Sequence, residues 1–81
     1  MKVLNIRDTE GFFETLSECT GEVEIIGKDG TGVSITPDSD GMKILKNTYR
    51  GGMIKEIELK IKDAGDILKM VDFMVSMDHA A

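Results

Sequence analysis

The sequence predicts an α+β fold, an open-faced sandwich in which three helices cover one face of a four-stranded, mainly antiparallel sheet. Some stretches alternate apolar and charged residues with a period of two, which is typical of strands with one buried face. Others repeat apolar residues every three or four positions, which is typical of helices packed on a core. Along the chain these stretches give the order β-α-β-β-α-β-α, and 81 residues suit a single domain over 1–81.

The first strand and the first helix lie within the first 21 residues. Residues 3–6 form a short apolar strand, and Asp8 or Thr9 can cap the helix that follows, because a short side-chain oxygen accepts bonds from free N–H groups. At about 100° per residue, the apolar residues of one helix face are Phe12, Leu16 and Cys19, with Phe13 at its edge. Gly21 is expected to end the helix in a left-handed conformation.

Two strands joined by a hairpin follow the first helix. In residues 22–26 and 32–36, β-branched residues alternate with polar ones, so each strand has one face for the core. Between them, Asp29-Gly30 is a strong hairpin signal because both residues tolerate a positive φ. Pro37 stops the second strand, since it has no N–H to donate to a neighbour.

A short helix is predicted within residues 38–49, with cap candidates at 38–40. Its apolar residues lie three or four positions apart and are Met42, Leu45 and Tyr49. Gly41 falls in the first turn, where glycine weakens a helix. Residues 50–52, Arg-Gly-Gly, break the helix before the next strand.

The last strand and the last helix fill the rest of the chain. Residues 53–62 alternate clearly, and Asp63 then caps a helix with Asp66 at its third position, as in a capping box. The centre of the buried face is predicted at Ile67, Val71 and Met74, and its flanks at Leu68, Met70, Val75 and Met77. Phe73 falls outside this sector, and residues 78–81 are expected to form a flexible tail.

Composition and charge exclude several classes of function. The net charge of −5 repels phosphate backbones and anionic lipid, so neither nucleic acid nor membrane is an expected partner. A single cysteine, Cys19, suits a reducing compartment, and no apolar run reaches membrane-spanning length, so we expect a cytoplasmic protein. The acidic turns lack the twelve-residue calcium loop, so we predict no metal site and no cofactor.

The order of elements resembles the HPr family, the small phosphocarrier proteins of the bacterial sugar phosphotransferase system. The resemblance spans almost the whole chain and rests on element lengths, the "KDG" hairpin and the capped short helix. It also rests on the closing segment "GGMIKEIELKIKDAGDILKMVDFMVSM", which is similar to the glycine-led last strand and amphipathic helix of the family. The resemblance implies an open-faced sandwich fold.

The chemistry of that family does not carry over to this chain. In the family, a histidine followed by an arginine and a proline opens the first helix, and the histidine ring accepts a phosphoryl group. The corresponding stretch here is "RDTEGFFET", which has none of these three residues. Asp8, Glu10 and Glu14 surround the helix amino terminus instead and would repel a phosphoryl group. We therefore predict that this turn caps its helix and holds no anion.

Two other side chains are candidate phosphorylation sites. Many members of the family carry a regulatory serine at the start of the short helix, and Ser39 is the nearest hydroxyl here, although Asp38 and Asp40 flank it. His79 is the only histidine, and it could accept a phosphoryl group only if the end of the chain folded back onto a helix terminus.

The resemblance also implies where a protein partner would bind. In the family, the first helix and the short second helix dock onto enzymes and regulators. The corresponding apolar residues here are Phe12, Phe13, Met42 and Leu45, and Phe73 adds an aromatic side chain outside the predicted core. Each could instead seal the core, and the six methionines suit an irregular core by default but also an adaptable surface.

The sequence thus favours a non-catalytic, HPr-like regulatory or protein-interaction module that is not an enzyme. The alternative is a phosphocarrier of the phosphoenolpyruvate-dependent system with an atypical acceptor, Ser39 or His79. A small-molecule-sensing domain of similar order is a third possibility. The expected oligomeric state is a monomer or a weak dimer.

Overall fold

The computed structural model describes residues 1–36, 39–49 and 52–79, with no account of the side chains of residues 78 and 79. The predicted hairpin stop at Pro37, the cap candidate Asp38 and the break at Arg50-Gly51 lie outside the described residues. The elements follow the predicted order: β1 (Lys2–Ile6), α1 (Thr9–Ser17), β2 (Val23–Ile26), β3 (Gly32–Ile35), α2 (Asp40–Thr48), β4 (Ile54–Ile61) and α3 (Ala64–His79).

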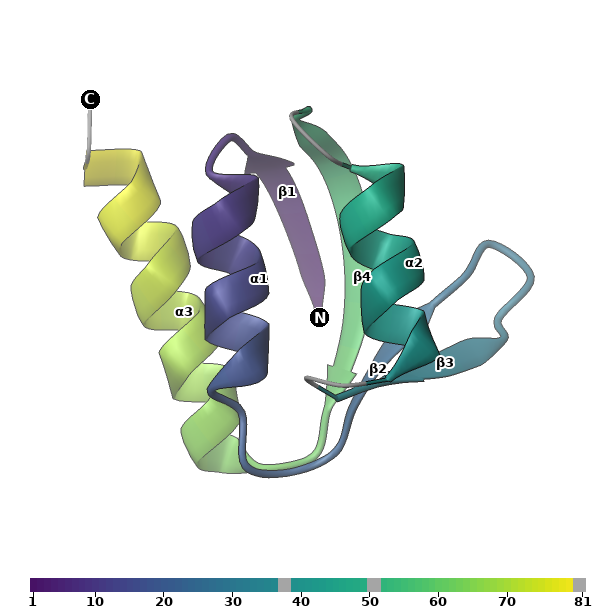
Figure 1. Ribbon diagram of the computed structural model, residues 1–81. Coiled ribbons are helices and arrows are strands. Elements are labelled where there is room, and N and C mark those ends of the chain that lie inside the picture. The colour runs from purple at the N-terminus through teal and green to yellow at the C-terminus, as the bar shows by residue number, and fades with distance from the viewer. Residues whose placement is uncertain (37–38, 50–51, 80–81) are drawn as a thin grey trace.

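The four strands form one antiparallel sheet in the order β1-β4-β2-β3, and the three helices lie on the same side of it (Figure 1). β4 and β2 are the two inner strands, and β4 pairs with β1 on one side, where Val3 lies opposite Ile57, and with β2 on the other, where Val23 lies opposite Ile61. The fold class predicted from the sequence is therefore confirmed. This topology places the start of α1 and the ends of α2 and α3 near the same end of the molecule, whereas α2 starts at the opposite end (Figure 1).

The core lies between the sheet and the helices. It is made of buried apolar side chains from every strand and every helix: Val3, Ile6, Phe12, Phe13, Leu16, Val23, Ile35, Met42, Leu45, Ile54, Ile57, Leu59, Met70 and Met77. Leu59 is buried and Ile61 half-buried, as the alternation of β4 predicts. On β1 the two buried residues are three apart rather than two, and Asn5 between them has a φ of 55°.

Two turns differ from their predicted conformations. Only Gly30 of the Asp29-Gly30 pair has a positive φ, of 84°, because the connection spans residues 27–31 rather than two residues. The Asp29 carboxylate accepts a 3.0 Å bond from the Thr31 N–H and fixes the turn from within. Gly21 is not left-handed either, and α1 ends at Ser17. The role of Gly21 is a close approach, since a Cβ there would lie 2.9 Å from Cβ of Asp63.

The buried face of α3 was predicted correctly at Met70, Met74 and Met77 and wrongly at its other positions. The residues that face the core are Asp66, Met70, Phe73, Met74 and Met77, whereas Ile67, Leu68, Val71 and Val75 are exposed. Apolar residues occupy more than half of this helix, so the period alone cannot choose a face. The choice is made by two contacts, the hydrogen bonds of Asp66 and the packing of Phe73 on Phe12, whose ring centroids are 6.2 Å apart.

Candidate functional site

The amino terminus of α1 is capped by its own acid. Oδ1 of Asp8 accepts a 3.0 Å bond from the Gly11 N–H, and the Asp8 carbonyl accepts another from the Phe12 N–H. Glu10 adds a second carboxylate to the first turn, and Thr9 is buried. A helix amino terminus attracts anions through its free N–H groups and its positive pole. In this protein the Asp8 carboxylate accepts a bond from one of these N–H groups, and the charges of Asp8 and Glu10 lie at the positive pole, as predicted for this turn.

Gly11 allows the cap to sit close to α3. A Cβ at this position would overlap Oδ2 of Asp8 and lie 3.0 Å from Cε1 of Phe73. The first turn of α1 is therefore enclosed on one side by its capping carboxylate and on another by the aromatic ring from α3.

Arg7 is the cation nearest to this turn in sequence, and it contacts another helix. Its guanidinium donates a 3.3 Å bond to the carbonyl of Met77, in the last turn of α3. A cation is favourable there, because the carbonyl end of a helix carries partial negative charge. The start of α1 and the end of α3 are thus each stabilised by the opposite charge from the same connecting segment.

Ser39 is the N-cap of α2, as its position predicts. Its hydroxyl oxygen accepts bonds of 3.1 Å from the Met42 N–H and 3.0 Å from the Thr36 N–H, and the hydroxyl donates to the Thr36 carbonyl. The hydroxyl is thus engaged in capping. α3 continues through His79, whose side chain lies outside the described part of the structure.

Four of the five partner-surface candidates belong to the core. The sequence left open whether these side chains form a partner surface or seal the core, and they seal the core: Phe12, Phe13, Met42 and Leu45 are buried. Phe73, predicted to be an exposed aromatic, is half-buried against Phe12. The buried faces of α1 and α2 pack these side chains against the sheet. A partner that binds this side of the molecule would therefore contact the polar residues on the outer faces of α1 and α2.

Those polar residues line a groove between α1 and α2. Its walls are Thr9, Glu10, Phe13, Glu14 and Ser17 on α1, and Lys46 and Asn47 on α2. Acidic side chains form one wall and a lysine stands on the other. Among the residues described, no group of three or more acidic, histidine or cysteine side chains has a metal-binding arrangement.

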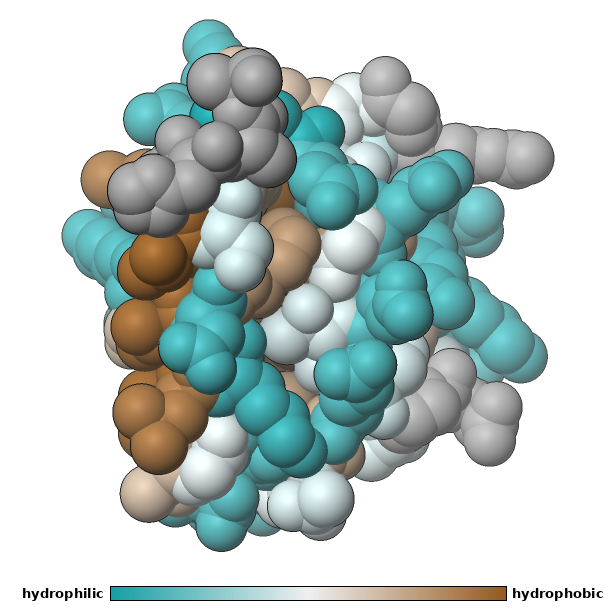
Figure 2. Space-filling model, turned by 90° about the vertical axis from the view of Figure 1, so that its left-hand side faces the viewer, coloured by the Kyte–Doolittle hydropathy of each residue, from teal (hydrophilic) through white to brown (hydrophobic). Residues whose placement is uncertain are grey.

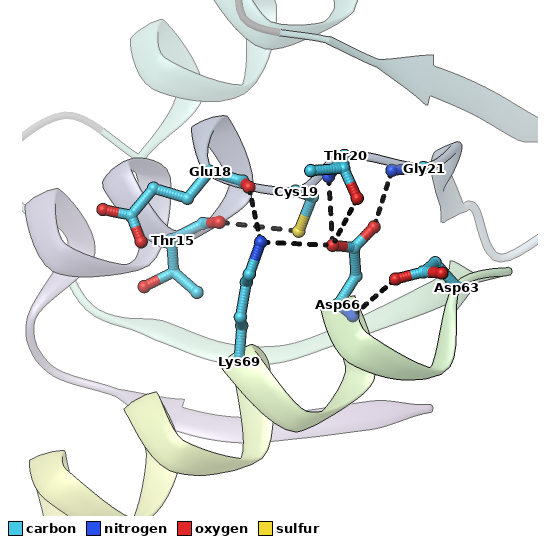
Figure 3. Close-up of polar contacts among 8 residues, drawn as sticks. All are labelled: Thr15, Glu18, Cys19, Thr20, Gly21, Asp63, Asp66 and Lys69. Carbon is cyan, nitrogen blue, oxygen red and sulfur yellow. Dashed lines mark hydrogen bonds and ion pairs between the residues drawn. The ribbon is translucent and has the colours of Figure 1, made fainter.

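A buried carboxylate that the sequence prediction treated only as part of a helix cap joins two distant segments (Figure 3). Asp66 has a fully buried side chain, and its two oxygens accept bonds from the Thr20 N–H at 3.0 Å and the Gly21 N–H at 2.7 Å. These two backbone bonds hold the pKa of the Asp66 carboxyl below its ordinary value. Asp63 does cap α3, accepting a 3.1 Å bond from the Asp66 N–H, but Asp66 does not complete a capping box.

Lys69 and Cys19 complete this cluster. Lys69 lies 3.6 Å from Oδ1 of Asp66 and donates a 2.9 Å bond to the Glu18 carbonyl at the end of α1. Burial raises the pKa of the Cys19 thiol, and the nearby Asp66 carboxylate raises it further. A thiol is less reactive when its thiolate is disfavoured, so the environment of Cys19 is that of a core residue. The cluster fastens the end of α1 to α3.

The exposed apolar side chains lie elsewhere than predicted. Ile44 on α2 is 65% exposed and Leu68 on α3 is 64% exposed, and Leu68 belongs to an apolar row on the outer face of α3 (Figure 2). The sequence could have indicated this row, because α3 contains more apolar residues than a single buried helix face can hold. Among the described residues, no helix combines the length and hydropathy needed to cross a membrane.

Scans against protein-family models, curated proteins and solved structures found no match to this chain.

Proposed function

We propose that the protein is an HPr-like domain that has no phosphocarrier activity and acts through contact with another protein. The observation that carries this proposal is the 3.0 Å bond from the Gly11 N–H to Oδ1 of Asp8. It occupies the helix terminus at which members of the resembled family hold their phosphoryl group. The hydrogen bond from Arg7 to the Met77 carbonyl at the end of α3 supports the proposal, because this arginine then does not stabilise the charge of a phosphoryl group at the start of α1.

The proposed contact surface is the groove between α1 and α2. The resemblance places partner binding on these two helices, and the groove exposes Glu10, Glu14 and Lys46 above a buried apolar layer. Charged side chains at the rim of an interface set orientation and association rate more than affinity. A partner surface with basic residues opposite α1 and an acid opposite Lys46 would suit this arrangement.

The proposal is tested by measuring phosphoryl transfer directly. The protein is incubated with the general phosphotransferase enzyme and phosphoenolpyruvate, beside a phosphocarrier of the family as a positive control, and its mass is measured. We expect the 8.9 kDa chain to keep its mass while the control gains one phosphoryl group. A gain of one phosphoryl group would reject the proposal in favour of the atypical carrier, and the variants Ser39→Ala and His79→Ala would then locate the acceptor.

A second measurement addresses the helix terminus itself. Inorganic phosphate is titrated into the labelled protein, and the amide signals of Thr9 to Phe12 are followed by NMR. We expect no saturable shift, because the Asp8 carboxylate already occupies the terminus and repels the anion. The variant Asp8→Asn keeps a capping oxygen and removes the charge, so a shift that is present in both proteins would contradict the proposed role of Asp8.

A further inference from the structure

α3 carries two rows of residues with the same spacing of four, three and four. The inner row packs against α1 and the sheet and consists of Asp66, Met70, Phe73 and Met77. The outer row is exposed and consists of Ala64, Leu68, Val71 and Val75. In this row Leu68 is 64% exposed, Val75 50% and Val71 36%. Figure 2 shows brown, apolar surface running along this side of the molecule.

This spacing indicates what kind of surface covers the outer row. Apolar residues that alternate in steps of three and four form the seam along which two helices pack side by side. The inner row is already used in this way, since its Phe73 packs against Phe12 of α1. Ile67, which is 38% exposed, widens the outer row on one side. The outer row therefore has the form of a second helix-packing seam.

We propose that α3 of a second copy of the chain occupies this seam, in antiparallel orientation about a two-fold axis. In this pairing Leu68 meets Val71 of the second copy and Ala64 meets its Val75, and the axis passes between Leu68 and Val71. Every apolar residue of the row then faces another, because a two-fold axis repeats each contact.

The charge beside the seam selects the antiparallel orientation. Asp72 is exposed and flanks the row on one side, while Ile67 and Met74 flank it on the other. A parallel pair would set each Asp72 against Ile67 of the other copy and remove water from a carboxylate beside an apolar side chain. An antiparallel pair sets Asp72 against Gly65 instead, which leaves room for water at the carboxylate.

The size of the seam predicts a weak dimer. α3 has 16 residues and is therefore about 24 Å long and about 10 Å wide. Its footprint of roughly 240 Å² is well below the roughly 800 Å² that each partner buries in a stable protein interface. The dimer should therefore form only at high protein concentration and dissociate on dilution.

Sedimentation equilibrium tests the association. Over about 10 μM to 1 mM protein, we expect the weight-average mass to rise from 8.9 kDa towards twice this value. Leu68→Lys should lower the association constant by about tenfold or more, because it places charges in the seam. The matched control Ile44→Lys replaces an equally exposed apolar residue on α2 and should leave it unchanged. A monomer mass throughout, or equal losses in the two variants, would overturn the proposal.

Spin labels test the orientation. A nitroxide is attached to Ala64→Cys in a Cys19→Ser background, and the distance between labels is measured at the highest concentration. In the antiparallel pair the two sites lie eleven residues apart along the helices, which gives about 19 Å between their Cα atoms. A separation of about 9 Å would mean parallel packing and would overturn the arrangement. Both tests are independent of the proposed function, since neither involves phosphoryl transfer nor the groove between α1 and α2.

Discussion

The backbone N–H of Gly21 donates a 2.7 Å hydrogen bond to Oδ2 of Asp66, 45 positions later in the chain. Together with the bond from the Thr20 N–H, it fastens the connection between α1 and β2 to the first turn of α3. The carboxylate is fully buried, yet both of its oxygens have donors and Lys69 lies 3.6 Å away. A buried charge is tolerated only when it is satisfied in this way.

Asp66→Asn should destabilise the fold markedly. The amide removes the charge that strengthens both backbone bonds, and its NH₂ group can accept no bond from the Thr20 or Gly21 N–H. We expect thermal denaturation to shift down by about 10 °C. Asp72→Asn, at an exposed position of the same helix, serves as the control and should shift it little. Equal shifts in the two variants would show that Asp66 is no anchor.

The same carboxylate should make stability depend on pH in the acid range. Because folding lowers the pKa of Asp66, its contribution is complete above its unfolded pKa of about 3.9 and is lost as the pH falls through the lower folded value. In urea denaturation between about pH 6 and pH 2, the stability difference between wild type and Asp66→Asn should be constant above about pH 5 and shrink below it. The pKa values of Glu22 and Asp29 are also lowered, by the Lys62 ammonium and the Thr31 N–H respectively, but both proteins share them. A difference that is independent of pH would contradict this prediction.

Gly41→Ala should destabilise the packing of α2 on β3. A Cβ at this position would lie 2.7 Å from the carbonyl oxygen of Ser34, a backbone atom that cannot move without shifting the strand. We expect a loss of about 2 kcal/mol in the free energy of unfolding by urea denaturation. At Gly52 the nearest atom to a new Cβ is 3.9 Å away, so Gly52→Ala should change stability by less than about 0.5 kcal/mol. If alanine at 41 stabilised the helix by its propensity, the close approach would be disproved.

Arg7→Gln should loosen the end of α3. The variant removes the cation from the Met77 carbonyl and should cost about 0.5 kcal/mol, a value typical of charges at helix ends. Hydrogen exchange of the amides from Met74 to Met77 should become faster, while exchange in α2 should not change. Lys55→Gln, at an exposed position on β4, controls for the loss of one positive charge. Unchanged exchange at the end of α3 would mean that the bond contributes nothing.

The sequence predicted the elements and the residues at the amino-terminal caps of the helices correctly. Ser39 and Asp63 cap helices because a short polar side chain before an apolar periodic run has few other uses. The alternation in β4 predicted its inward face, since a strand offers only two faces. The sequence did not predict whether the partner-surface candidates are accessible. Phe12, Phe13, Met42 and Leu45 would have the same spacing in the sequence whether they were buried in the core or exposed to a partner.

The sequence alone thus determined the order and type of the elements, the residues that cap the amino termini of the helices, and the acidic character of the turn before α1, because these depend on residues within one or two helical turns. Only the tertiary structure decided which face of α3 is buried, and therefore which apolar row is exposed. That choice depends on contacts between residues far apart in the chain, Asp66 with Gly21 and Phe73 with Phe12. When a helix has apolar residues on two sides, its own sequence does not indicate which side packs against the core.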